Sequence, residues 1–230
     1  MIEIPGVRPS ADIRAELAGK PVLLAFSCGK DAIASWLALR DAGVDVVPYY
    51  LYYLPGLRFI EDSLAGFEGI FGQRIARYPH PSLYRWLNNL VFQPPERCAV
   101  IEAARLPSPT YEQVVSLIRE DHSLTPDTWV ADGVRAADSI VRRTSIKTHG
   151  PMKPSNRKVS VIWDWQKAEV LTAIAAAGIA LPPDYEWFGR SFDGIDYRFL
   201  EPLSRFAPED YRRVLEWFPL AELELVRHAV

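Results

Sequence analysis

A turn with the residue types of a phosphate site lies within PVLLAFSCGKDAIASWLALRDAG (21–43), between an apolar run and a helical pattern. Such a turn presents unpaired backbone N–H groups at the positive end of the helix dipole, where anions bind. Gly29 permits close approach of a phosphate or a positive φ, Ser27 offers a hydroxyl and Lys30 a point charge. The Walker pattern is absent because Leu24 replaces its first glycine and no Ser or Thr follows Lys30. We therefore expect a phosphate loop of another type.

Two further segments are rich in Gly, Pro, Arg and polar residues and lack a clear period. They are GVRAADSIVRRTSIKTHGPMKPSNRK (133–158) and LPPDYEWFGRSFDGIDYRF (181–199). Both are predicted to be binding loops. Within the second, Arg190, Ser191 and Asp193 stand among glycines and aromatic residues, so this part of the loop could close over a substrate as a lid.

Alternating strands and helices are predicted to position these segments. Apolar and β-branched runs predict strands, and helical spacing with capping residues predicts helices, one capped by Ser108 with Pro109 first and one capped by Asp164. The alternation implies right-handed crossovers in an α/β fold, a doubly wound, mostly parallel sheet flanked by helices. Ligands of such sheets bind at the carboxyl ends of the strands. The expected strands are 22–26, 44–53, 73–78, 127–133 and 158–163, and the expected helices include 57–71, 82–91, 94–104 and 165–178.

Composition narrows the class of protein. The 230 residues are 49% hydrophobic and 24% charged, with a net charge of −3, which is ordinary for a globular chain. The total charge gives no indication of nucleic-acid binding, although a local basic patch is compatible with it. Neither a signal peptide nor an apolar run of about 20 residues is present, so we expect a cytoplasmic protein with no membrane partner. The two cysteines, Cys28 and Cys98, are too few for an iron–sulfur cluster or a Cys₄ zinc site.

Three segments resemble a known family. AFSCGKDA resembles the S-G-G-K-D-S signature of PP-loop ATP pyrophosphatases, with Cys28 in place of the middle Gly and Ala32 in place of the last Ser. VIWDWQKAEVLTAIAAAGIALPPDY resembles a helix and proline-containing loop of the phosphoadenosine phosphosulfate (PAPS) reductase branch of that superfamily. WVADGVRAADSIVR resembles the G-x-R-x-x-[QD]-S-x-x-R segment of the same branch, with Gly133, Arg135, Asp138, Ser139 and Arg142 in register.

The resemblance covers about residues 20–200 and implies an adenine nucleotide alpha hydrolase-like domain at 1–200, followed by a helical extension at 201–230 packed on it. It implies an enzyme that binds ATP and Mg²⁺, cleaves ATP between the α and β phosphates and adenylylates an unidentified acceptor. A homodimer is also expected.

The resemblance also assigns roles to particular residues. Lys30, Asp31, Arg135 and Arg142 would be catalytic, and Asp31 would help to hold Mg²⁺. Adenine is expected near residues 50–53. The nucleotide-binding set is Ser27, Cys28, Gly29, Lys30, Asp31, Gly133, Arg135, Asp138, Ser139 and Arg142.

The sequence leaves alternatives open. Sulfonucleotide reductases of this branch carry a nucleophilic cysteine in a C-terminal tail, and here no cysteine follows Cys98. A reductase would therefore need a borrowed thiol or Cys28, which is either a reactive thiol or a small residue tolerated where glycine is usual. A non-catalytic nucleotide-binding module is the other alternative. Asp138 and Ser139 could also simply cap a short helix.

Overall fold

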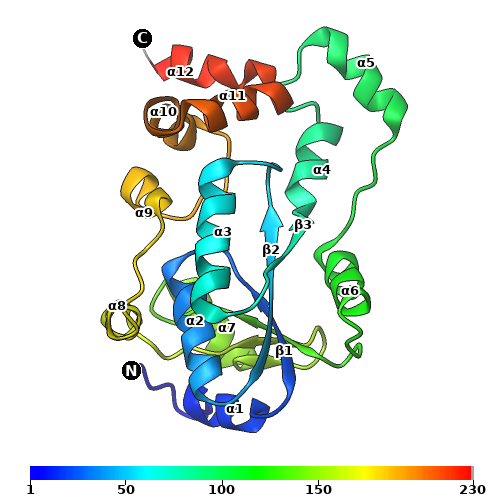
Figure 1. Ribbon diagram of the computed structural model, residues 1–230. Coiled ribbons are helices and arrows are strands. Elements are labelled where there is room, and N and C mark those ends of the chain that lie inside the picture. Colours follow the sequence, from blue (N-terminus) through cyan, green and yellow to red (C-terminus); the bar gives the residue numbers. More distant parts are fainter. Residues whose placement is uncertain (229–230) are drawn as a thin grey trace. The chain divides into compact units, whose positions relative to one another are not determined.

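The computed structural model describes residues 1–228 (Figure 1). Their strands form one six-stranded sheet in the order β3-β2-β1-β4-β6-β5. β1 runs parallel to β2 and β4, β4 runs parallel to β6, and only the short β5 is antiparallel to its neighbour β6. The predicted α/β fold with a mostly parallel sheet is confirmed. The strands are β1 (Pro21–Ala25), β2 (Asp45–Tyr52), β3 (Ala76–Pro79), β4 (Trp129–Asp132), β5 (Met152–Lys153) and β6 (Lys158–Ser160).

Helices connect the strands and make up the C-terminal part of the chain. No helix among residues 1–228 is long and apolar enough to cross a membrane. The helices before β4 are α1 (Ser10–Leu17), α2 (Lys30–Asp41), α3 (Arg58–Phe71), α4 (Pro81–Asn88), α5 (Pro95–Ala104) and α6 (Tyr111–Asp121). Those after β4 are α7 (Ile140–His149), α8 (Lys167–Ala176), α9 (Pro183–Phe188), α10 (Tyr197–Phe206), α11 (Pro208–Trp217), the 3₁₀ helix η1 (Pro219–Glu222) and α12 (Leu223–His228).

The chain divides into two compact units. Unit 1 comprises residues 1–50 and 116–181, and unit 2 comprises residues 51–115 and 182–230. The segment from 201 onward lies in unit 2 together with 51–115, and the functional division at residue 200 stays a prediction.

The core of unit 1 is built on β1. Val22, Leu23 and Leu24 are completely buried, as expected of an apolar run in the middle of a parallel sheet. α2 packs against α8, and eight consecutive residues of α2 are buried. Pro48 lies inside β2 in register with Leu24 and does not end that strand. β1 and α2 therefore hold the turn between them rigidly.

Several predicted boundaries were wrong. The segment 133–158 contains α7 and β5, and 181–199 contains α9 and the start of α10, so neither is simply a loop. α6 begins at Tyr111 rather than Pro109, and Thr110, not Ser108, accepts the N–H of Gln113, at 3.2 Å. α7 and α9 were hard to predict because they bury few apolar residues. In α7 only Ile146 is buried.

Asp164 caps a different helix from the one predicted. α8 begins at Lys167 and is capped by Gln166 and Glu169 in a reciprocal capping box. Asp164 is buried and binds the first residue of α1 instead. Its carboxylate accepts the Ser10 N–H at 2.9 Å and the Ser10 hydroxyl at 2.5 Å. This pair ties α1 to the segment that follows β6.

We predict that Asp164→Ala destabilises the protein by about 2–4 kcal/mol, because it removes two charge-assisted hydrogen bonds and leaves buried donors unpaired. Urea unfolding followed by circular dichroism measures the change. Asp12→Asn, at an exposed position of α1, is the matched control and should leave the midpoint nearly unchanged. Equal midpoints for the two variants would show that the contact to Ser10 is dispensable.

Candidate functional site

The turn after β1 and the loop after β4 lie at the carboxyl ends of neighbouring parallel strands. From β1 the chain proceeds to β2 on one side, and it later returns to place β4 on the other side, so the strand order reverses between β1 and β4. Ligands of doubly wound sheets bind at such a switch point. Both sequence segments predicted to bind phosphate therefore meet at the expected place within unit 1.

The backbone of the first turn differs from the prediction in one respect. Gly29 has an ordinary φ of −75° and precedes the first residue of α2, whereas Cys28 has a φ of 58°. The left-handed conformation expected of glycine thus falls on the cysteine, at the position where the PP-loop signature has its middle Gly. Cys28 is 5% exposed. Lys30 and Asp31 are the first two residues of α2, so they stand where an α-helix has N–H groups without intrahelical acceptors.

Gly133 brings the second loop against the first. A Cβ atom at this position would lie 2.9 Å from the backbone carbon and oxygen of Asp31. Real Cβ atoms do not approach backbone so closely, so only glycine permits this packing. The close approach explains why a glycine directly follows β4.

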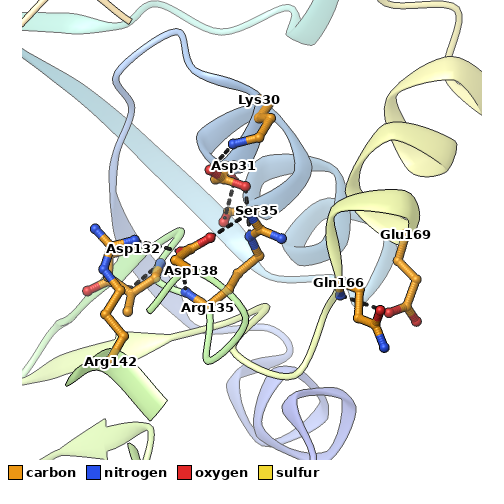
Figure 2. A network of polar contacts seen from close by, with 10 residues as sticks. Lys30, Asp31, Ser35, Asp132, Arg135, Asp138, Arg142, Gln166 and Glu169 are labelled. Atoms are coloured by element: carbon orange, nitrogen blue, oxygen red, sulfur yellow. Dashed lines mark hydrogen bonds and ion pairs between the residues drawn. The ribbon is translucent and has the colours of Figure 1, made fainter. Parts of the chain in front are cut away.

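A chain of alternating charges links the two loops, and Figure 2 shows its members pointing toward one another. Lys30 Nζ lies 2.6 Å from Asp31 Oδ2, and Arg135 Nε lies 2.9 Å from Asp31 Oδ1. Asp138 bridges the two arginines, with 2.6 Å from Oδ1 to Arg135 Nη2 and 2.6 Å from Oδ2 to Arg142 Nη1. Three cations and two carboxylates thus give the cluster one excess positive charge.

Arg135 is the buried member of this cluster. Its side chain is 4% exposed, and Nη1 has no hydrogen-bond partner among the described residues. The contact of Nε with Asp31 is an ion pair without the angle of a hydrogen bond. A buried guanidinium with an unused donor is costly unless an anion completes its partners. Arg135 is therefore the residue that best fits a bound phosphate oxygen.

The remaining residues of the second loop have local structural roles. Ser139 is the N-cap of α7, where its hydroxyl accepts the Arg142 N–H at 3.1 Å. Asp138 orients the loop, because Oδ2 also accepts the Arg135 N–H at 3.2 Å. Sequence reasoning missed Asp132, the last residue of β4, whose carboxylate accepts the Val134 N–H at 3.1 Å. Burial raises the pKa of Asp132.

The donor set fits Mg²⁺ only in part. No group of three or more His, Cys, Asp or Glu side chains among residues 1–228 could hold a metal ion. Asp31 is a single carboxylate already paired with Lys30 and Arg135. Mg²⁺ at such sites is typically held by one or two carboxylates together with substrate phosphates. Asp31 thus fits a metal that arrives with a nucleotide, not a resident ion.

The predicted lid residues belong to unit 2. Arg190 and Asp193 form an exposed ion pair with each other, and Ser191 is half-buried between them. Asp184, which sequence reasoning did not single out, accepts the Phe192 N–H at 3.2 Å, while its Oδ1 has no hydrogen-bond partner in the described chain. Burial raises the pKa of Asp184 to about 6.

An aromatic cluster in unit 2 lies where β2 and β3 end. Tyr53 is stacked on His80 and Trp86, with ring centroids 4.1 and 5.5 Å apart. The Ser82 N–H donates to His80 Nδ1, and His80 Nε2 lies 2.6 Å from the Tyr111 hydroxyl. Burial lowers the pKa of His80 to about 4 and raises that of Tyr53 to about 12, so both are uncharged at neutral pH. Tyr53 is thus engaged within unit 2, and the expected adenine position near 50–53 stays a prediction.

We predict that Gly133→Ala destabilises unit 1 by about 1–3 kcal/mol, because the added methyl group would overlap the Asp31 backbone. The control is Gly66→Ala in α3, where the methyl group meets nothing within 4 Å and should stabilise the helix by about 0.5–1 kcal/mol. Urea unfolding distinguishes the two. A stabilising Gly133→Ala would show that the loops do not pack as closely as described.

We predict that Cys28→Gly is more stable than Cys28→Ala by about 1 kcal/mol, because glycine adopts the left-handed conformation without steric cost. At Ala34, inside α2, the order must be the reverse, and Ala34→Gly should destabilise by about 1 kcal/mol. The measurement is the unfolding midpoint of each variant in urea. If Cys28→Ala proved the more stable, the turn would not require a positive φ.

Comparisons with known proteins give a limited result. No protein-family model and no curated protein matches the chain. Among solved structures, the chain is similar to a predicted subunit of tRNA methyltransferase from Methanocaldococcus jannaschii, with 17% sequence identity and a TM-score of 0.37. The match covers 83% of this chain and 91% of that one. Similarity at this level assigns no activity to the chain.

Proposed function

We propose that this protein is a PP-loop enzyme of the PAPS reductase-like type that binds ATP and cleaves it between the α and β phosphates to adenylylate an acceptor. The observation that carries the proposal is the close packing of Gly133 on Asp31, with buried Arg135 beside them. It brings two motif segments that are far apart in sequence to one point at the start of α2. An unused guanidinium donor at that point supports an anionic ligand.

The reaction would place few covalent demands on the protein. An acceptor oxygen attacks the α-phosphorus, the bond from that phosphorus to the α–β bridging oxygen breaks, and pyrophosphate leaves. Such transfer depends on positioning and on neutralising the charge of the leaving group. The first N–H groups of α2 would hold the pyrophosphate portion, and Lys30, Arg135 and Arg142 would pair with its oxygens. Mg²⁺, held by Asp31 and the phosphates, would supply further charge neutralisation.

The carboxylates of the cluster also have a role in this proposal. Asp31 and Asp138 pair with the same cations that phosphate oxygens would bind, so they hold these side chains in place before the nucleotide arrives. Pre-positioned cations lose less conformational entropy when a ligand binds. The carboxylates would also compete with the phosphates for these cations, since each phosphate oxygen must share a cation with a carboxylate or displace the carboxylate.

The test is phosphorus NMR of Mg·ATP incubated with the protein, with water taking the place of the acceptor. We expect AMP and pyrophosphate as products, and Arg135→Gln should lower ATP affinity at least about 10-fold, because a charge-assisted contact is worth about 1.5–3 kcal/mol. Arg212→Gln in α11, at an exposed position, is the control. ADP and orthophosphate as products would contradict the proposal.

The same preparation separates the alternatives. Release of sulfite from PAPS in the presence of thioredoxin would indicate a reductase, and its loss in Cys28→Ala would assign the thiol. The burial of Cys28 speaks against that role. Thermal stabilisation by ATP without any cleavage would indicate a binding module, since a ligand at 100 times its dissociation constant stabilises by about 2.7 kcal/mol.

A further inference from the structure

The segment 139–163 has a positive net charge although the chain as a whole is acidic. It contains no Asp or Glu, while the complete chain has a net charge of −3. We call this segment the basic region. Its lysines and arginines are Arg142, Arg143, Lys147, Lys153, Arg157 and Lys158.

The basic region is a folded and continuous part of unit 1. α7 ends at His149 and the chain then enters the β5–β6 pair. Lys153 Nζ lies 3.5 Å from Ser145 Oγ, which joins the strand pair to the helix. The side chains of Arg143 and Lys147 are exposed to solvent. The positive charges are therefore presented on ordered structure.

The arrangement of these charges costs stability. Arg143 and Lys147 stand one helical turn apart, where like charges repel. Lys153 and Lys158 are directly opposite each other in the β5–β6 pair, where like charges also destabilise. Attraction to the carboxylate of Asp132 offsets part of this repulsion. Among residues 1–228, no ion pair involves Arg143 or Lys147. Arg142 and Arg157 are paired with Asp138 and Asp127. The requirements of folding alone do not account for Arg143 and Lys147, whereas an anionic partner would.

The basic region starts at the candidate nucleotide site. Ser139 caps α7, and Arg142 is paired through Asp138 with Arg135 (Figure 2). Arg143 and Lys147 follow Arg142 in α7, so the cations continue from the site along the helix. In the first turn, Ile140 is 85% exposed and Val141 is 78% exposed. Apolar side chains beside arginines are suited to contacts with sugars and base edges, alongside phosphate contacts.

These observations favour a regularly charged polymer over a single small anion or a membrane. A helix of 10 residues is about 15 Å long and carries its exposed cations along that length, which suits successive phosphates. A helix that lies on a membrane needs a continuous exposed apolar face, but the exposed apolar residues of α7 are confined to its first turn and Ile146 is buried. We propose that the basic region binds the phosphate backbone of a nucleic-acid strand.

The test measures binding of labelled single-stranded RNA, single-stranded DNA and duplex oligonucleotides by fluorescence anisotropy over a range of salt concentrations. ATP is left out of the assay. Arg143→Glu removes one cation and places a carboxylate one turn before Lys147, where it forms a favourable pair. We expect at least 10-fold weaker binding and a salt slope reduced by about 1–2, as for the loss of one or two phosphate contacts. The melting temperature should stay the same or rise.

The control is Arg212→Glu in α11, which makes the same charge change at an exposed position outside the basic region. Its binding affinity should stay within 2-fold of that of the original protein, a difference of about 0.4 kcal/mol or less. The proposal is overturned if no oligonucleotide binds, if both variants weaken binding equally, or if only vesicles containing phosphatidylserine bind. Whether RNA or DNA binds more tightly identifies the natural strand. Because ATP is absent, failure here does not bear on ATP cleavage, and failure of ATP cleavage does not bear on this result.

Discussion

The packing of Gly133 against the backbone of Asp31 is the constraint on which the candidate site depends. It fixes the loop after β4 against the first turn of α2, and the parallel pairing of β1 with β4 provides the frame for that contact. A side chain at position 133 would separate the loops and withdraw Arg135 from Asp31. The geometry of the charged cluster thus depends on the lack of a side chain at Gly133 as well as on the charged residues.

The charged cluster combines a structural and a ligand-binding requirement. A guanidinium as buried as that of Arg135 needs carboxylates nearby, and Asp31 and Asp138 supply them. Removing one carboxylate would leave the buried guanidinium with a single carboxylate partner, so both residues contribute to folding even without a ligand. The unused Nη1 donor is the part of the cluster that folding does not explain.

The sequence predicted the fold well where local patterns were strong. The apolar run of β1, the amphipathic pattern of α3 and the glycine after β4 all led to elements that the structure contains. The sequence-based prediction failed where a contact joins residues far apart in the chain or where the apolar pattern of a helix is weak. The partner of Asp164 is Ser10, far away in the chain, and no local pattern indicates such a pair. A helix at α7 was expected only as an alternative, with Asp138 and Ser139 as capping residues. Its apolar pattern is weak, because Ile146 is buried while Ile140 and Val141 are exposed.

Within the site, the motif residues could be predicted but their mutual contacts could not. The sequence placed Lys30, Arg135 and Arg142 together as phosphate ligands, but their pairing with Asp31 and Asp138 depends on how two loops meet. The net charge gives no indication of the basic region, because acidic residues elsewhere in the chain outweigh it, and only the Arg-rich composition of 133–158 pointed to a binding segment there.

Local opening of the turn can be followed through the reactivity of the Cys28 thiol, since Cys28 has a left-handed backbone conformation and is buried. The side chain is buried while the residue keeps this conformation, so a thiol reagent must wait for the turn to come apart locally. The rate of alkylation would then follow the population of the opened turn, and any ligand that holds the N-terminus of α2 closed would slow it. The alkylation rate of Cys28, a non-glycine residue with a positive φ, thus reports how often the turn at the candidate site opens.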